Sequence, residues 1–240
     1  MTENNIVLLE DALHKLKIVY DNEMIDKFIE YKKMVLEWNE KINLTAIVDE
    51  KEFIIKHFID SIMCASFPDL NKLDKVIDVG TGAGFPGIPL SIIFPDKEFL
   101  LVDSLNKRVN FLSEVIENIG LNNVKALHGR AEDLGQNKLY REQFDLCVSR
   151  AVAKLNVLSE YCLPFVKIGG YFAAYKSKHI KDEIDESRKA IRILGGEIAE
   201  HHEEYVDSYF SDHQIIYIKK NAATPLQFPR KAGNPTKSPL

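Results

Sequence analysis

VIDVGTGAGFPGIPL, residues 76–90, is the stretch of the sequence that decides the fold. Its first residues are apolar and mostly β-branched, which predicts a short buried strand. Glycines follow at positions 80, 82, 84 and 87, where the chain has to turn sharply and another group can approach the backbone. Pro86 suits the first turn of a following helix, because the N–H that proline lacks would be unpaired there in any case. A strand, a glycine loop and a helix in this order form the nucleotide-binding turn of an open α/β sheet.

The glycine spacing alone leaves two classes of cofactor open. Gly82, Gly84 and Gly87 match G-x-G-x-x-G, the loop of the dinucleotide-binding dehydrogenases. Asp78 argues against a dinucleotide, because a carboxylate and a pyrophosphate repel each other. The pattern D-x-G-x-G resembles the first motif of the S-adenosylmethionine-dependent methyltransferases, in which the acid and the glycines surround the methionine part of the cofactor. Asp78, Gly80 and Gly82 are therefore predicted to bind S-adenosylmethionine.

Composition narrows the class of protein further. A chain of 240 residues that is 45% apolar is expected to form one sizeable domain with a real core, or one domain with an appendage. It contains no run of 18 apolar residues that would predict a membrane span, and acids interrupt its first residues where a signal peptide would be apolar. The three cysteines are scattered, which predicts buried thiols in a reducing cytosol rather than disulfides or a metal site. We expect a cytoplasmic protein that binds neither a metal nor a membrane. The net charge of −5 does not favour nucleic acid as a partner, but a local basic patch is compatible with it.

Three regions differ in pattern. Residues 1–74 have helical periodicity and predict an N-terminal helical extension packed on the core. Residues 75–220 alternate strands with helices, which predicts a Rossmann-like α/β methyltransferase fold with a mostly parallel seven-stranded sheet covered on both faces. Residues 221–240 are basic and rich in proline, and we expect them to form an extended tail of the same structural domain. The predicted strands are 75–79, 98–102, 124–128, 144–149, 169–175, 197–205 and 214–219, of which the last two close the sheet as an antiparallel pair. The predicted helices are 4–19, 22–39, one through 53–58, one from 86, one from 106, 155–163 and 179–193.

Polar residues follow several strands, at the edge where open α/β sheets bind their ligands. Asp103, after the second strand, can accept two hydrogen bonds from a ribose diol, or it can cap the next helix. Ala131 and Glu132, after the third strand, are placed to meet an adenine edge, or they form an exposed turn. Arg150 follows the fourth strand and can hold a phosphate or a base with both of its terminal nitrogens, or pair with an acid. Lys176 ends the fifth strand in a similar position.

A second set of polar residues lies in the helical region. Asn43, Thr45, His57, Asp60 and Ser61 are denser than a simple helical cap requires. Such residues more often cap helices and form turns, and contact with a substrate is the alternative. The sequence also lacks an Asn/Asp-Pro-Pro-aromatic motif and a Pro-Cys nucleophile, which argues against methylation of amino groups and of cytosine carbon 5.

Six segments together resemble the RsmG (GidB) family, the bacterial guanine-N7 methyltransferases of small-subunit ribosomal RNA. They are NEKINLTAI (39–47), HFIDS (57–61), the loop 78–87, GRAE (129–132), SRA (149–151) and PRKAGNPTKSPL (229–240). The resemblance implies S-adenosylmethionine as the methyl donor, guanine 527 of 16S rRNA as the target, and free 16S rRNA or the small ribosomal subunit as the partner. It implies that the cofactor pocket is lined by Gly80, Phe85, Ala131, Glu132 and Arg150. Arg150 is also the residue expected to act in catalysis, by orienting the cofactor or the base. The residues expected to contact the substrate are Asn43, Thr45, His57, Asp60, Lys176, Arg230 and Lys231.

Two rival functions stay open on the residues alone. The first is a nucleotide-binding dehydrogenase, which calorimetry with S-adenosylmethionine and with NAD distinguishes from a methyltransferase. The second is a non-catalytic rRNA-binding factor that keeps the pocket as a relic, which a test for methyl transfer to small subunits distinguishes.

Overall fold

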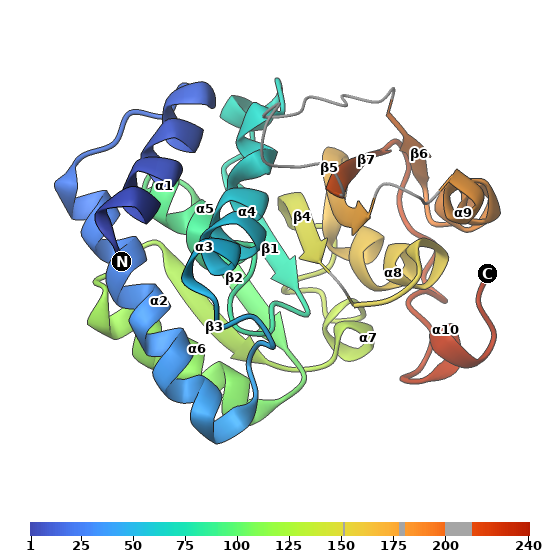
Figure 1. Cartoon of the computed structure of the whole chain (residues 1–240). Coiled ribbons are helices and arrows are strands. Elements are labelled where there is room, and N and C mark those ends of the chain that lie inside the picture. The colour runs from blue at the N-terminus through green and yellow to red at the C-terminus, as the bar shows by residue number, and fades with distance from the viewer. Residues whose placement is uncertain (151, 178–180, 200–212) are drawn as a thin grey trace.

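The computed structural model describes residues 1–150, 152–177, 181–199 and 213–240. Within these residues a seven-stranded sheet has the order β3-β2-β1-β4-β5-β7-β6 (Figure 1). The strands are β1 (Lys75–Val79), β2 (Glu98–Asp103), β3 (Val124–His128), β4 (Phe144–Arg150), β5 (Val166–Ser177), β6 (Gly196–Ile198) and β7 (His213–Lys220). The first five strands are parallel to one another, and β7 runs antiparallel between β5 and β6. The predicted mostly parallel sheet with a closing antiparallel pair is confirmed. A dehydrogenase sheet has the order 3-2-1-4-5-6 and lacks the inserted strand.

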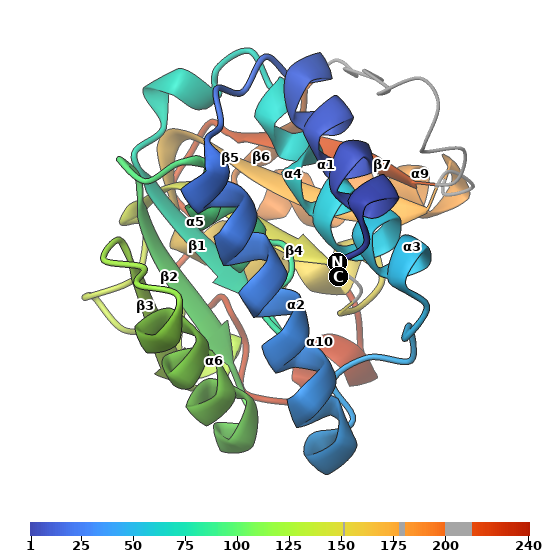
Figure 2. The ribbon, with the colours of Figure 1, turned by 60° about the vertical axis from the view of Figure 1, so that its left-hand side comes forward.

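Helices cover both faces of the sheet because alternate residues of each buried strand point to opposite faces. In β1, Val76 belongs to one apolar cluster, whereas Ile77 and Val79 belong to the other. The first cluster includes residues of α1 (Glu3–Lys15), α2 (Asn22–Ile42), α3 (Glu50–Phe53), α4 (Asp60–Ile62), α5 (Gly87–Ile93) and α6 (Asn106–Asn118). The second cluster includes residues of α7 (Ala131–Leu134), α8 (Leu155–Cys162) and α9 (Lys181–Ile193). Figure 2 shows α2 and α6 side by side on the first face.

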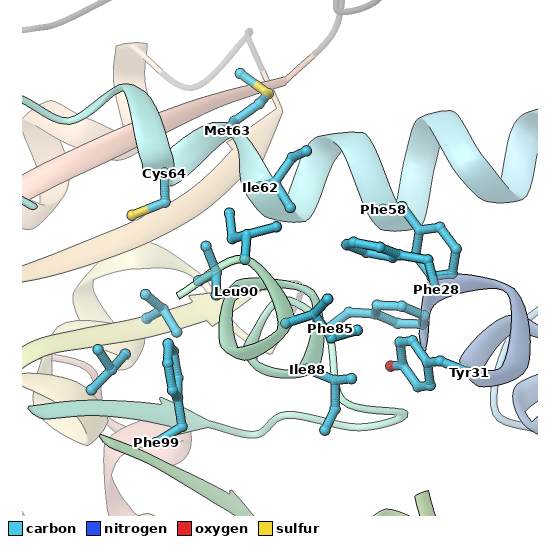
Figure 3. Close-up of a cluster of buried hydrophobic side chains, with 14 of the residues drawn as sticks. Phe28, Tyr31, Phe58, Ile62, Met63, Cys64, Phe85, Ile88, Leu90 and Phe99 are labelled. Atoms are coloured by element: carbon cyan, nitrogen blue, oxygen red, sulfur yellow. The ribbon is translucent and has the colours of Figure 1, made fainter. Parts of the chain in front are cut away.

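The N-terminal helices pack directly on the glycine loop. Aromatic rings from α2, from the segment 54–59 and from the loop before α5 meet in one buried cluster (Figure 3). The ring centres of Phe28 and Phe58 are 4.9 Å apart, and those of Tyr31 and Phe85 are 5.4 Å apart. Truncating one of these buried phenylalanines to alanine costs about 3–5 kcal/mol of folding free energy. The division of the chain at residues 74 and 220 stays a prediction, since the helices before residue 74 share this core with the sheet.

The prediction of an extended C-terminal tail is wrong. Phe228 is only 4% exposed, and the segment Asn234–Lys237 forms α10. The guanidinium of Arg141 donates hydrogen bonds to the carbonyl oxygens of Thr224 and Phe228, at 2.6 and 2.7 Å. These partners are 83 and 87 residues away along the chain, so local sequence patterns could not show the contact.

Other differences concern the ends of elements. The helix predicted through residues 53–58 is α3 followed by a π-helical segment, η1 (Ile54–Ile59), and by α4. The strand predicted from residue 169 already begins at 166, and its register with β4 shifts between Val166 and Tyr171. The last part of the predicted strand 197–205, the first residues of the predicted helix 179–193, and Ala151 lie outside the described residues.

The remaining short helical turns are η2 (Met63–Ser66), η3 (Leu70–Lys72) and η4 (Leu163–Phe165). In the part of the chain that the structure describes, no helix combines the length and the apolar character needed to cross a membrane.

Candidate active site

A cavity of about 680 Å³ lies at the carboxyl ends of the central strands. The glycine loop after β1 forms its floor, and residues that follow β2, β3 and β4 form its sides. This is where open α/β sheets bind ligands. Seven residues of the predicted cofactor set line the cavity, namely Gly80, Gly82, Phe85, Asp103, Ala131, Glu132 and Arg150.

Two glycines of the loop share a left-handed backbone but differ in what surrounds them. Gly80 has a φ of 73°, and a Cβ there would lie 2.6 Å from a methyl carbon of Val152. Gly82 has a φ of 63°, and a Cβ there would meet no atom within 4 Å, because the residue faces open space. Left-handed backbone favours glycine in both cases. The second glycine therefore leaves room for a ligand to approach the backbone.

Asp103 joins the loop to the helix that follows β2. Its Oδ2 accepts a hydrogen bond from the Gly82 N–H at 3.0 Å, and its Oδ1 accepts one from the Leu105 N–H at 2.8 Å. The carboxylate is only 3% exposed, and Arg108 lies 3.4 Å from it. Asp103 is not the N-cap of α6, because the N-cap is Leu105 and no side chain of the described residues caps this helix. The Asp103 side chain lines the cavity and holds the backbone just before α6.

The structure corrects the placement of Asp78. This side chain is fully buried and does not line the cavity. Its Oδ2 accepts hydrogen bonds from the Thr81 hydroxyl at 2.7 Å and the Gly87 N–H at 2.8 Å, whereas its Oδ1 has no hydrogen-bond partner. Burial raises the pKa of Asp78 to about 7, against the lowering effect of these hydrogen bonds. Asp78 therefore holds the shape of the loop through Thr81 and Gly87 and is not part of the lining of the cavity.

Arg150 ties the cavity to the N-terminal helices. Its guanidinium lies 2.6 Å from the Asp60 carboxylate, which is only 2% exposed, and 5.2 Å from the centre of the Phe85 ring. It also donates to the carbonyl oxygen of Lys56 at 2.8 Å. The π-helical turn accounts for this contact, since the Asp60 N–H bonds to Ile55, five residues back, instead of to Lys56. Such single π turns are frequent at functional sites.

His57 also lines the cavity, next to Phe85 and Arg150. Its ring stacks on Phe85, with centres 4.4 Å apart and planes 11° apart. A guanidinium can only donate, so Nδ1, 3.3 Å from Arg150, is assigned as an acceptor, and Nε2–H then donates to the Thr45 hydroxyl at 2.7 Å. Burial, and next the Arg150 charge, lower the pKa of His57 to about 3. The ring is neutral near pH 7 and both nitrogens have partners.

Tyr31 braces the glycine loop from the same side. Its hydroxyl, which Figure 3 shows beside Phe85, donates to the carbonyl oxygen of Ala83 at 2.6 Å. A Cβ on Gly84 would lie 2.8 Å from that hydroxyl. The N-terminal helices therefore hold the loop itself as well as the residues around it.

Most of the residues predicted to contact substrate lie away from the cavity. His57 lines it, and Thr45 and Asp60 reach it only through His57 and Arg150. The other four residues of this set do not line it.

Each of those four has another setting. Asn43 is exposed in the left-handed position that ends α2, with a φ of 49°. Lys176 pairs with Glu183 at 2.6 Å, and Arg230 pairs with Glu160 at the same distance. Lys231 is exposed.

Sequence reasoning missed several of the residues that line the cavity, among them Leu44, Arg108 and Tyr161. A signal existed for Arg108, because a basic residue in the first turn after Asp103 is close to that carboxylate. Leu44 belongs to the quoted segment 39–47, but its apolar side chain carried no chemical signal. Tyr161 reaches the cavity from the end of α8, which only the packing of the helices decides.

Comparison with known proteins agrees with this geometry. The family model for GidB, described as rRNA small subunit methyltransferase G, matches residues 24–206. The Ribosomal RNA small subunit methyltransferase G of Alkaliphilus oremlandii (strain OhILAs) is 52% identical over 97% of this chain and 98% of its own. That of Clostridium tetani (strain Massachusetts / E88) is 50% identical over the same shares. A solved structure of StiE O-MT, residues 961–1257, shares the fold, with a TM-score of 0.53 at 12% identity over 70% of this chain and 75% of that one. These matches confirm the resemblance that the motifs indicated, and the chain belongs to the GidB family, rRNA small subunit methyltransferase G.

Proposed function

We propose that this protein transfers a methyl group from S-adenosylmethionine to N7 of a guanine in 16S rRNA, at position 527, in the cytoplasm. The observation that carries the proposal is the match of about half of all residues, over nearly the whole chain, to relatives named for methylation of small-subunit rRNA. A dehydrogenase would belong to another family and would lack the antiparallel β7.

The cavity suits S-adenosylmethionine, which supplies a methyl group made electrophilic by the sulfonium. The open face of Gly82 lets a ligand approach the loop backbone, and the buried Asp103 carboxylate offers acceptors for a ribose diol. Gly80 and Gly82 would hold the methionine part, and Ala131 and Glu132 would meet the adenine edge. The volume of about 680 Å³ falls within the range of cofactor pockets.

The chain's own task in the reaction is positioning. Guanine N7 has a free lone pair and no proton, so its attack needs no general base. His57 fits this scheme, because both of its nitrogens are hydrogen-bonded and its low pKa keeps it neutral. Arg150 would orient the target base beside Phe85, and proximity and orientation would supply most of the acceleration.

The test is to incubate the protein with labelled S-adenosylmethionine and either free 16S rRNA or small ribosomal subunits, and then to map the modified nucleotide. We expect 7-methylguanine at position 527, with a single-turnover rate nearly constant from about pH 6.5 to 8.5, around the ordinary histidine pKa. A rate that rises about tenfold per pH unit would mean that the target atom loses a proton, which excludes N7. Binding of cofactor and RNA without methyl transfer would instead identify a non-catalytic rRNA-binding factor.

A further inference from the structure

The C-terminal tail, residues 221–240, contacts two side chains that line the cavity. The Gly233 N–H donates to Oε1 of Glu132 at 3.2 Å. The hydroxyls of Thr236 and Tyr161 are 2.9 Å apart. Figure 1 shows α10, which contains Thr236, next to α8, whose last turn contains Tyr161. This wall of the cavity is therefore braced by the last residues of the chain.

Arg230 anchors the tail to α8. Its Nε lies 2.9 Å from Oε1 of Glu160 and its Nη2 lies 2.6 Å from Oε2, so the two groups pair through two parallel hydrogen bonds. The backbone N–H of Arg230 donates to the same carboxylate at 2.8 Å, and its Nη1 donates to the Ser238 carbonyl oxygen at 2.9 Å. Glu160 is only 1% exposed. A charged pair of this geometry is strong and directional, so it fixes the tail on both sides of Gly233.

The beginning of the tail is fixed by a second set of buried contacts. The ammonium of Lys220, which is fully buried, lies 2.8 Å from the Thr224 hydroxyl and 2.7 Å from the Leu163 carbonyl oxygen. The Thr224 N–H donates to Glu142 at 2.8 Å. The beginning of the tail is therefore held by Lys220 and Thr224, and Arg230 holds the part of the tail just before Gly233.

We propose that Arg230 is a positioning residue of the cofactor site, which holds the tail on α8 and thereby places the Gly233 N–H on Glu132 and Thr236 on Tyr161. The inference rests on the proposed function, because it requires the cofactor to occupy this cavity. Since Glu132 follows β3, where the adenine edge is expected, the tail acts on the adenosyl end of the cofactor. Arg230 contributes to cofactor binding, while Lys231 and Lys237 stay exposed on the outside of the tail.

The experiment measures binding of S-adenosylhomocysteine to the full-length protein by calorimetry, at a temperature where circular dichroism shows each variant to be folded. Arg230→Gln is expected to raise the dissociation constant about tenfold, the effect of losing one well-formed hydrogen bond to the site. Arg230→Lys keeps the positive charge but cannot form the two parallel hydrogen bonds to Glu160, so it should recover part of the affinity. Lys237→Ala removes an exposed cation from the same tail and is the matched control, with unchanged affinity for the cofactor product.

A second ligand distinguishes positioning from general stabilisation. S-inosylhomocysteine carries a carbonyl where adenine has its amino group, so the wild type should bind it more weakly than S-adenosylhomocysteine. Arg230→Gln should reduce this preference, because the segment that meets the adenine edge is no longer held. If Arg230→Gln is unfolded at the assay temperature, Thr236→Val, which removes one exposed hydroxyl, should show the same loss of preference to a smaller degree.

Two negative results have different meanings. If the wild type binds S-adenosylhomocysteine and the folded Arg230→Gln or Thr236→Val variant binds it with equal affinity and preference, Arg230 only stabilises the fold and the inference is overturned. If the wild type itself does not bind S-adenosylhomocysteine, the proposed function fails and the inference fails with it.

Discussion

The two walls of the cavity are held in different ways. On the N-terminal side, charge lies directly at the cavity, with Arg150 paired to the buried Asp60 and in contact with His57. On the C-terminal side, the tail contacts the lining of the cavity through the Gly233 N–H, on the Glu132 carboxylate, and through the Thr236 hydroxyl, on Tyr161. The charged pair of Arg230 and Glu160 lies farther from the cavity, since neither residue lines it. Changes to the first wall should therefore affect folding and the response to pH. On the second wall, a change of Arg230 leaves the buried Glu160 carboxylate without its guanidinium, so it should lower stability as well as affinity for the cofactor.

The largest effect is expected from Arg150→Ala. It leaves the buried Asp60 carboxylate without its guanidinium, and removing one partner of a buried pair typically costs about 3–5 kcal/mol. Urea unfolding measures the loss, and the double variant Arg150→Ala with Asp60→Asn should recover part of it. If Arg150→Ala is as stable as the wild type but transfers no methyl group, Arg150 acts only on the reacting groups and the N-terminal wall does not depend on it.

Asp103→Ala should have the next largest effect, and it belongs to neither wall. Hydrogen bonds to a charged group are worth about 1.5–3 kcal/mol, so affinity for S-adenosylmethionine and S-adenosylhomocysteine should fall about tenfold to a hundredfold. Calorimetry measures both constants. Unchanged affinity would show that Asp103 only supports the Gly82 loop and the start of α6.

The pH dependence of stability should show two opposing contributions near the N-terminal wall. The folded state lowers the pKa of His57 to about 3, so the unfolded chain binds the extra proton and stability is lost as pH falls below about 6.5, the ordinary histidine pKa. It raises the pKa of Asp78 to about 7, so the folded chain holds the extra proton and stability is lost as pH rises from about 4 toward 7.

Single variants should separate these contributions. Urea unfolding between about pH 4 and 7 should show that His57→Gln removes the loss in acid and that Asp78→Asn removes the loss toward neutral pH. Each slope should change by up to roughly 1.4 kcal/mol per pH unit, in opposite directions. Lys237→Ala, which removes an exposed cation of the tail, is the comparison from the other wall and should leave the slope as it is in the wild type. Parallel curves for all four proteins would contradict the assignment of both groups.

The smallest effect is expected from Tyr31→Phe. It removes the hydrogen bond to the Ala83 carbonyl oxygen and keeps the packing of the ring against Phe85. The loss should be about 1 kcal/mol, seen as lower stability and as a severalfold weaker affinity for the cofactor. If stability falls and affinity does not, the N-terminal helices support the fold of the glycine loop without setting its shape for the ligand.

The sequence predicted the residues whose places follow from the ends of strands. Asp103 is the last residue of β2 and Glu132 lies in α7, the element that follows β3, so their common location at one edge of a parallel sheet needed no knowledge of distant contacts. Asp78 was misplaced because it lies inside β1, where alternation turns its side chain toward α5 and away from the cavity. The ion pair of Arg230 could not be predicted, because its partner Glu160 is 70 residues away, in a helix whose sequence does not indicate this contact.

The position of β7 has a consequence for how the protein is made. In the sheet as the structure describes it, β6 pairs only with β7, although β7 comes later in the chain. A ribosome delivers the chain from its N-terminus, so β6 has no strand to pair with until β7 has also been synthesised. The segment with Arg230 emerges later still. A nascent chain can therefore form the glycine loop before the residues that complete the other wall have left the ribosome.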